Sequence, residues 1–380
     1  MGVSRASPAT EPGKDGRLSS DRDALKAAFL SAAGFGDARR ELMSGDASTR
    51  VYERLHLADG SSRIFMDQPP RAETAPCPPE ASRQQRIALG FNAAYRLASG
   101  RVDAFVACAR HLKSLGLSAP EVEAFDAAAG LAVLEDLGDD LYASHIAARG
   151  DEAELYDAAI DALVRLHAAP PPAVLASDDV AWPLLSYDDL ALVSAGDLFT
   201  DWLPRLRPAF APDAAVLAEW EALWAPIRAR AEATADVFCH RDYHAENLIW
   251  LPDREGAARV GLIDFQDAVR ANRMWDLSML LHDARRDVSP ELEARALDRY
   301  FAAHPGLDRV QATSDFHALG ALNVARIIGI FARLVVRDGK PKYEGFLPRL
   351  WRYLDRCLAD PAMTGMKAWF DAHVPAEARS

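Results

Sequence analysis

The chain has 380 residues, of which half are hydrophobic and about a quarter are charged. This composition is that of an ordinary globular protein, and the length suits two lobes with substantial cores. The net charge of −13 argues against a broad nucleic-acid-binding surface, and no apolar run approaches the roughly 20 residues of a membrane span. Neither a nucleic acid nor a membrane is therefore expected as a partner.

The first 20 residues are polar and contain proline, glycine and serine without an apolar centre. This pattern is not that of a secretory signal, and a disordered tail is expected over 1–20. The four cysteines are widely spaced and form no CxxC pair, which favours reduced thiols over disulfides or zinc ligation. We expect a cytoplasmic protein that acts as a monomer.

A small, β-rich N-terminal lobe is predicted over residues 21–137. Residues 21–33 have the apolar spacing of a helix, with Asp21 as a possible cap. The alternation of Val51, Glu53 and Leu55 with Tyr52, Arg54 and His56 predicts a strand, and Asp59-Gly60 is a strong hairpin signal. Further strands are expected at 63–66, 122–125 and 130–137.

A larger, mostly helical lobe is predicted over residues 138–380. Residues 152–167 have apolar side chains at helical spacing, and the helix ends at His167, for which a structural role is expected. An amphipathic helix is expected around 323–334. The lobe also contains the segment from Asp236 to Asp267, in which short apolar runs predict strand, loop, strand, turn and strand.

Three side chains gather at one end of this predicted strand unit: Asp242, Asn247 and Asp264. Metal-assisted phosphoryl transfer needs such groups. One carboxylate accepts the proton of the attacking hydroxyl, while an amide oxygen and a second carboxylate hold magnesium on the nucleotide phosphates. Asp242 is therefore the candidate catalytic base, and Asn247 and Asp264 are the candidate metal ligands.

The segment resembles the kinase catalytic loop H-x-D-x-x-x-x-N followed by D-F-G. Here the loop reads His240-Arg-Asp-Tyr-His-Ala-Glu-Asn247, and the second motif reads Asp264-Phe-Gln266. His244 within it is typical of the aminoglycoside phosphotransferase and choline kinase branch. The resemblance implies an α+β, bilobal protein-kinase-like fold that uses ATP and Mg²⁺, with ATP between the lobes and direct in-line transfer to the acceptor.

The same resemblance implies where the nucleotide would be contacted. The small-residue loop before the first hairpin suits backbone amides laid over phosphates, and the strand over 130–137 leads into a hinge that presents backbone groups to adenine. The cofactor-binding candidates are Ser44, Gly45, Asp46, Ala47, Ser48, Thr49, Arg50, Glu135, Asp136 and Leu137.

The third strand departs from the kinase pattern, because Ile64-Phe-Met-Asp67 holds no lysine to grip the α- and β-phosphates. An arginine could serve instead, with Arg50, Arg54 and Arg63 as candidates, or magnesium and the backbone could carry the phosphates. The chain could also be a degraded kinase, which the surviving base and metal positions disfavour.

Four further stretches resemble the bacterial anomeric kinases of N-acetylmuramate and N-acetylglucosamine. They are Gly45-Asp-Ala-Ser48 with Met66-Asp-Gln-Pro-Pro70, Phe331-Ala-Arg-Leu334, and Arg337-Asp-Gly-Lys340. That branch lacks the lysine as a family trait. The resemblance implies phosphorylation of a sugar at its C1 hydroxyl in cell-wall sugar recycling.

The acceptor site is expected in the C-terminal lobe. Residues 315–380 carry a local net charge of +3 in an acidic protein, which suits a neutral or carboxylate-bearing sugar better than a polycation. An arginine fork suits a carboxylate, and Arg326 or Arg333 is the candidate. The substrate-binding candidates together are His244, Glu246, Asp267, Arg326 and Arg333.

Asp276 and the pair His282-Asp283 are expected to take no direct part in the chemistry. In related kinases an aspartate at the position of Asp276 braces the catalytic loop through backbone amides, and it would also cap the next helix. His282-Asp283 resembles a catalytic pair, but adjacent residues on a helix do not face one another, so surface positions are expected.

Three other functions remain open on the sequence. The protein could be another small-molecule kinase, acting on an aminoglycoside, choline or methylthioribose. It could be a pseudokinase that serves as a binding module, a possibility raised by the missing lysine. It could also act on a protein or tRNA, although the sequence offers no basic groove for either.

Overall fold

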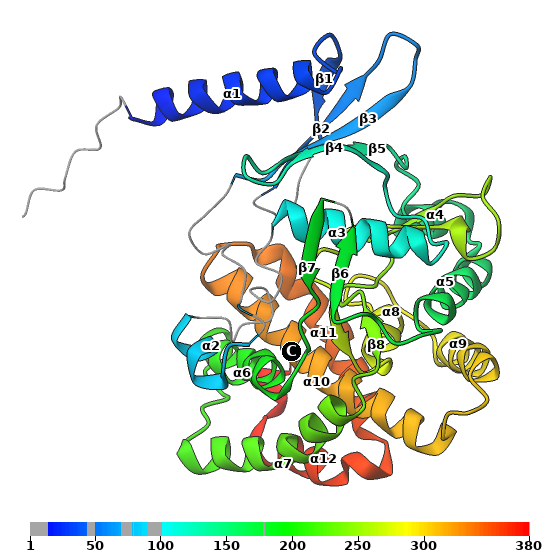
Figure 1. The fold of residues 1–380 in the computed structure, drawn as a ribbon. Coiled ribbons are helices and arrows are strands. Elements are labelled where there is room, and N and C mark those ends of the chain that lie inside the picture. The colour runs from blue at the N-terminus through cyan, green and yellow to red at the C-terminus, as the bar shows by residue number, and fades with distance from the viewer. Residues whose placement is uncertain are drawn as a thin grey trace, which may run out of the picture. The chain divides into compact units, whose positions relative to one another are not determined.

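The structure, a computed structural model, describes residues 14–43, 50–69, 78, 80–89, 101–177 and 179–379. The chain divides into two compact units (Figure 1). The smaller comprises Met1–Pro70 and Glu121–Asp136, and the larger comprises Arg71–Pro120 and Leu137–Ser380. Residues 71–120, which we had placed in the N-terminal lobe, group with the larger unit, because α3 (Val102–Ser114) packs on its strands β6 and β7.

The smaller unit is built on a five-stranded antiparallel sheet. Its strand order is β1-β2-β3-β5-β4. The predicted hairpin joins β2 to β3, and Gly60 at its turn has φ +85°, a left-handed conformation that glycine adopts without strain. The strands are β1 (Arg39–Leu42), β2 (Val51–His56), β3 (Ser62–Asp67), β4 (Val122–Asp126) and β5 (Leu131–Glu135).

Helix α1 (Lys14–Ala32) belongs to the smaller unit and contributes to its core. Leu30 packs with Leu55, Phe65, Leu131 and Val133, a set that alternates along β2, β3 and β5 as one face of a sheet must. The helix begins at Lys14, so part of the expected tail over 1–20 is helical. Asp21 lies inside the helix and does not cap it; residues 1–13 lie outside the described part of the chain.

Asp67 anchors α1 at the end of β3. Its carboxylate is only 5% exposed and accepts a hydrogen bond from Arg22 Nε at 3.1 Å, while Lys26 Nζ lies 3.6 Å away. Arg22 also donates to the carbonyl of Ala129 at 2.7 Å. A buried carboxylate requires such partners, and here two of them come from one helix at a spacing of four residues.

The larger unit is mostly helical, with three two-stranded antiparallel sheets. Its helices are α2 (Arg83–Leu89), α3, α4 (Tyr142–Arg149), α5 (Glu152–Leu166), α6 (Asp189–Leu206), α7 (Ala214–Ala233), α8 (Met274–Leu281), α9 (Pro290–Ala303), α10 (Arg309–Val336), α11 (Leu347–Leu358) and α12 (Thr364–His373). Its strands are β6 (Val174–Ser177), β7 (Val180–Pro183), β8 (Val237–Cys239), β9 (Leu248–Trp250), β10 (Val260–Leu262) and β11 (Val269–Ala271).

Helix α10 is the core helix of the larger unit, and it packs against α6, α8 and α11 (Figure 1). By length and composition it could cross a membrane, although no such segment was expected from the sequence; 72% of its apolar window is buried inside the protein. The tryptophans Trp182, Trp220 and Trp224 are also buried in the core of this unit.

Candidate active site

Strands β9 and β10 place the candidate metal ligands next to each other. The strands pair with Leu248 opposite Leu262, and the register continues one residue further, where Ile263 N donates to Asn247 O at 3.2 Å. Asp264 therefore follows immediately beside Asn247. Strand β8, which leads into the loop, pairs with β11 rather than with β9.

The side chain of Asn247 is oriented by the catalytic loop itself. Its Nδ2 donates to the carbonyl oxygen of Asp242 at 2.8 Å and lies 3.3 Å from His244 Nε2. Because the amide nitrogen is used inside the loop, the amide oxygen is turned to the opposite side. This orientation leaves the oxygen, the hard ligand that Mg²⁺ prefers, available for a cation.

Two residues of the site have left-handed backbones although neither is glycine. Arg241 has φ +78° and Asp264 has φ +61°, and among the described residues they are the non-glycine positions with positive φ. Such conformations persist only where the surroundings impose them, and they cluster at functional sites. Gln266 Nε2 donates to Asp264 Oδ1 at 2.9 Å and so helps to fix that carboxylate.

Asp276 braces the strained part of the loop, as expected. Its carboxylate is fully buried and accepts hydrogen bonds from His240 N at 2.7 Å, Arg241 N at 2.8 Å and Cys239 Sγ at 3.1 Å. The expected capping role is wrong, because Asp276 lies within α8. The N-cap position is Arg273, and Asn272 just before it accepts a hydrogen bond at Oδ1 from Met274 N at 2.8 Å.

His167 supports this brace from the end of α5. It is fully buried, its Nδ1 lies 2.8 Å from the Tyr300 hydroxyl, and its Nε2 lies 3.7 Å from Asp276. Burial by itself raises the pKa of Asp276, but the nearby imidazole groups of His167 and His240 outweigh it and hold the pKa below its ordinary value. The structural role expected for His167 is therefore confirmed.

A pocket of about 130 Å³ lies beside Asp242 and is lined by residues of the larger unit. Asp242 and His244 come from the catalytic loop, the segment after α8 supplies Arg285, and α10 supplies Arg326. Arg326 Nη2 lies 3.9 Å from Asp242 Oδ1. The pocket therefore brings the candidate base together with two of the five predicted substrate-binding residues, His244 and Arg326.

The other three predicted substrate-binding residues do not line this pocket. Glu246 is linked to it indirectly, since its carboxylate pairs with Arg285 at 2.7 Å. The carbonyl of Asp267 accepts a hydrogen bond from Arg241 at 3.3 Å. Arg333 lies two helical turns beyond Arg326 on α10.

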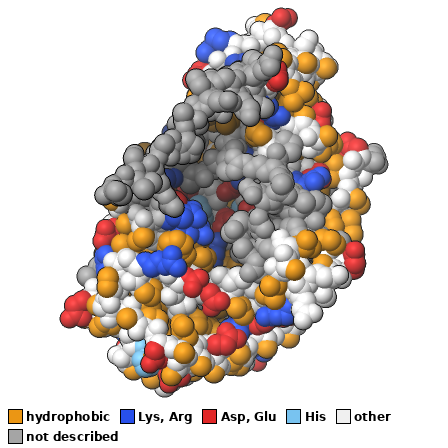
Figure 2. Space-filling view, turned by 90° about the vertical axis from the view of Figure 1, so that its left-hand side faces the viewer, with side chains coloured by type: hydrophobic (Ala, Val, Ile, Leu, Met, Phe, Trp, Pro, Cys, Tyr) orange, Lys and Arg blue, Asp and Glu red, His pale blue; other side chains and the backbone are white. Residues whose placement is uncertain are grey.

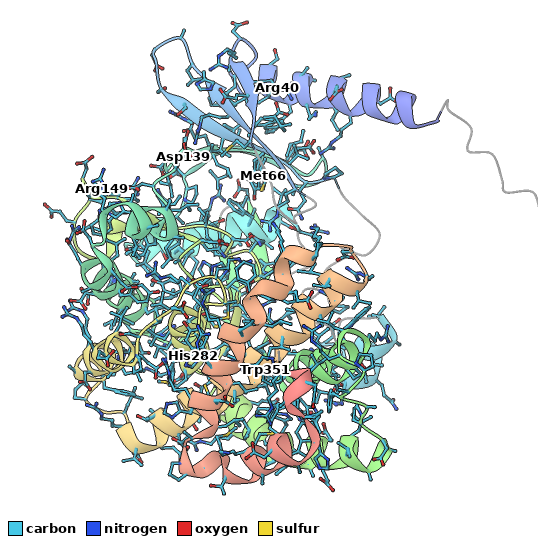
Figure 3. The ribbon with its side chains drawn as sticks, turned by 180° about the vertical axis from the view of Figure 1, so that it is seen from behind. Arg40, Met66, Asp139, Arg149, His282 and Trp351 are labelled. Atoms are coloured by element: carbon cyan, nitrogen blue, oxygen red, sulfur yellow. The ribbon has the colours of Figure 1, made fainter. Side chains whose placement is uncertain are left out.

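The expectation that His282 and Asp283 lie at the surface is wrong. Helix α8 ends at Leu281, and the two residues that follow it are buried. Both also line the pocket. Asp283 accepts hydrogen bonds from Ala245 N at 3.3 Å and Arg285 N at 2.8 Å. Figure 3 shows His282 among the helices of the larger unit, where Glu293 lies 3.4 Å from its Nε2.

The nucleotide-binding candidates belong mostly to the smaller unit, and Ser44–Thr49 lie outside the described residues. Arg50 follows them directly, and its Nη1 donates to the Tyr52 hydroxyl at 3.3 Å. Of the other arginines considered for the missing lysine, Arg54 pairs with Asp136 at 2.7 Å and Arg63 pairs with Glu123. The partner of Arg54 lies just after β5 and the partner of Arg63 lies on β4, so both charges are matched by carboxylates of the smaller unit.

The three hinge candidates lie where the chain passes from the smaller to the larger unit. Asp136 is held by Arg54 and by the Ser62 hydroxyl, which donates to it at 2.7 Å. Glu135 ends β5, where its carboxylate accepts from Glu121 N at 3.1 Å. Leu137 begins the larger unit. The side chains of Glu135 and Asp136 thus hold the end of β5 in place.

The donor set fits a magnesium ion that is shared with a nucleotide. Among the described residues no group of three or more His, Cys, Asp or Glu side chains is arranged to hold a metal. Mg²⁺ needs no such group, because it usually binds through one or two carboxylates together with substrate phosphates and water. Asn247 and Asp264 supply one amide oxygen and one carboxylate at neighbouring positions.

Residues 40–312 match the phosphotransferase enzyme family (APH), and the chain belongs to this family. Among its relatives is the N-acetylmuramate/N-acetylglucosamine kinase of Caulobacter vibrioides, which is 69% identical over 362 residues, covering 95% of this chain and 99% of the relative. A kinase of the same description from Pseudomonas aeruginosa is 30% identical over 83% of this chain and 82% of its own length.

Solved structures confirm the expected α+β, bilobal kinase-like fold. A choline/ethanolamine kinase family protein from Mesorhizobium loti has a TM-score of 0.54 at 16% identity, covering 93% of this chain and 98% of its own. Amicoumacin kinase in complex with AMP-PNP and Ca²⁺ also has a TM-score of 0.54 at 16% identity, covering 90% and 95%. At this identity the likeness concerns the fold alone.

Proposed function

We propose that the protein is an ATP-dependent kinase that phosphorylates the C1 hydroxyl of N-acetylmuramate and N-acetylglucosamine. The observation that carries this proposal is the 69% identity, over nearly the whole chain, to a kinase described by those two sugars. The phosphorylated sugars would enter the recycling of cell-wall material. We place the enzyme in the cytoplasm and expect it to act as a monomer.

Each residue of the site has a role in this reaction. Asp242, with its side chain 24% exposed beside the pocket, orients the C1 hydroxyl and accepts its proton. An anomeric hydroxyl is more acidic than an ordinary alcohol, so the proton can leave late. Asn247 and Asp264 would hold Mg²⁺, which neutralises charge on the phosphates. Positioning and charge neutralisation then account for catalysis without a covalent intermediate.

The charges around the pocket support a neutral or singly charged acceptor. Two carboxylates, Asp242 and Asp283, are matched there by two guanidinium groups, Arg285 and Arg326. A polycationic aminoglycoside would require an excess of acidic side chains. On the face drawn in Figure 2, basic and acidic side chains are interspersed over the described surface, and this mixture gives no support to an RNA acceptor.

The substrate is tested by measuring ADP release with Mg²⁺ and ATP against N-acetylmuramate, N-acetylglucosamine, kanamycin and choline in parallel. We expect turnover on the two N-acetyl sugars and none on their methyl glycosides, in which C1 is blocked. Turnover confined to kanamycin or choline would contradict the proposed acceptor, although the protein would still be a phosphotransferase. Nucleotide binding without turnover on any acceptor would favour the pseudokinase.

The roles of the two carboxylates are separated by a pair of variants. Asp242→Ala should lower turnover by orders of magnitude while Mg²⁺-dependent ATP binding remains, because the base is not a nucleotide ligand. Asp264→Ala should instead weaken ATP binding in the presence of Mg²⁺ and leave binding without Mg²⁺ unchanged. Calorimetry with and without the ion distinguishes them, and unchanged turnover of Asp242→Ala would refute the assignment of the base.

A further inference from the structure

The pocket beside Asp242 is small and partly open to solvent. Its volume is about 130 Å³, whereas pockets that enclose entire drug-sized ligands usually measure about 300–1,000 Å³. It therefore suits one substituent of the acceptor together with part of the ring. One wall is apolar and is formed by Met279, Ile327, Ile330 and Phe331.

Arg326 is fixed in the wall of this pocket before any ligand binds. It is 7% exposed, and its Nη1 donates to Asn323 Oδ1 at 2.9 Å. Asn323 is itself fully buried, with its Nδ2 2.8 Å from the sulfur of Met279. The guanidinium carbon lies 6.0 Å from the centre of the Trp275 ring. Such preorganisation lowers the entropic cost of binding an anion.

The charge of Arg326 is only partly matched inside the protein. The carboxylate oxygen Asp242 Oδ1 is 3.9 Å from Nη2, beyond hydrogen-bonding distance. Arg285, the other guanidinium of the pocket, is by contrast paired with Glu246 at 2.7 Å. A buried cation is costly unless it is both paired and hydrogen-bonded. Arg326 therefore has donor capacity for an anionic group that enters the pocket.

We propose that Arg326 forms a subsite for a carboxylate on the acceptor sugar, so that the pocket discriminates an acidic N-acetyl sugar from its neutral counterpart. The inference rests on the proposed function and specifies the group that its acceptor site recognises. A planar guanidinium can bind a carboxylate through two parallel hydrogen bonds. The apolar side chains of the lining then receive the methyl groups of the substituents.

The test compares kcat/KM for N-acetylmuramate and N-acetylglucosamine in the wild type and in Arg326→Gln. We expect the ratio of the two values to fall about tenfold or more in the variant, because a charge-assisted bond to the acidic sugar alone is lost. Arg326→Lys, which keeps the charge without the fork, should give an intermediate ratio. The methyl ester of N-acetylmuramate should respond to the substitutions as the neutral sugar does.

Arg309→Gln provides the matched control, since Arg309 lies on the same helix but is exposed and pairs with the exposed Asp298. It should leave the ratio unchanged. An equal loss on both sugars in Arg326→Gln would overturn the proposal and make Arg326 a positioning residue for Asp242. An unchanged ratio with unchanged rates would overturn it as well. Failure of the wild type on both sugars would instead refute the proposed function.

Discussion

A single buried carboxylate, Asp276, holds the backbone that presents Asp242, the proposed catalytic base. Its two oxygens accept from consecutive amides, His240 N and Arg241 N, and this arrangement stabilises the left-handed backbone of Arg241 just before Asp242. The strained residue, Arg241, therefore directly precedes Asp242, the proposed base, which lines the pocket. The geometry of Asp242 depends on a residue that does not touch the acceptor.

Asp276→Asn should disturb this arrangement while preserving its size. The asparagine amide presents one acceptor and one donor, so one of the two backbone amides would face a donor. We expect a loss of about 2–3 kcal/mol in unfolding free energy and at least a tenfold fall in kcat with a smaller change in KM.

Thermal unfolding and steady-state kinetics provide the measurements. Ser278→Ala on the same helix is the control, because the Ser278 hydroxyl is buried and donates only to the carbonyl of Trp275 within the helix. If Asp276→Asn had no greater effect than Ser278→Ala, Asp276 would not be the brace.

At the scale of elements, α10 and α6 are held in close contact by a glycine. A Cβ atom at Gly329 would lie 2.2 Å from the backbone of Leu198 and 2.5 Å from Phe199 N. No flexible side chain can yield there, because the obstructing atoms belong to the helix backbone. This contact sets the position of α10, which carries Arg326 into the pocket one turn earlier.

Gly329→Ala should therefore destabilise the protein by about 3 kcal/mol or more through overpacking. Gly196→Ala on α6 should instead stabilise the protein and raise its unfolding free energy by up to about 1 kcal/mol. Its Cβ would meet only Trp220 at 3.9 Å, and alanine is the better helix former. Chemical denaturation of both variants tests the pair; a stable Gly329→Ala would mean that the two helices can separate.

At the scale of the whole molecule, buried histidines make stability depend on pH. Burial lowers the pKa of His167, His240 and His282 below 6.5. The unfolded chain takes up protons at these positions near pH 6.5, whereas the native state does not. Stability is therefore complete above this pH and is lost as the pH falls through the window below it.

The midpoint of thermal unfolding should fall by several degrees between pH 7 and pH 5, before most carboxylates titrate. The variant His282→Gln should reduce this dependence, because it removes one of the three groups. His373→Gln, at the end of α12, is the comparison variant. A midpoint that rises or stays level as the pH falls from 7 to 5 would contradict the direction assigned to the three pKa values.

Much of the fold was predictable from local patterns. The strands around Asp59-Gly60 and the helix that ends at His167 follow from hydrophobic period and turn residues. The spacing of Asp242, Asn247 and Asp264 indicated the class of chemistry, because the strand pairing that joins Asn247 to Asp264 is itself short-range. The start of α1 was missed, since residues 14–20 contain a single large apolar side chain, Leu18, and so give little hydrophobic signal.

The sequence by itself determined the family, the fold class and the three residues proposed for chemistry. Each rests on residue spacing and hydrophobic pattern within short segments, which can be recognised without knowledge of the tertiary contacts. Only the tertiary structure decided that His282 and Asp283 are buried in the pocket wall and that Arg326, rather than Arg333, lines it. The positions of these side chains depend on where α8 ends and on how α10 packs. Contacts between segments that are distant in the sequence decide this burial, so no local sequence pattern predicts it.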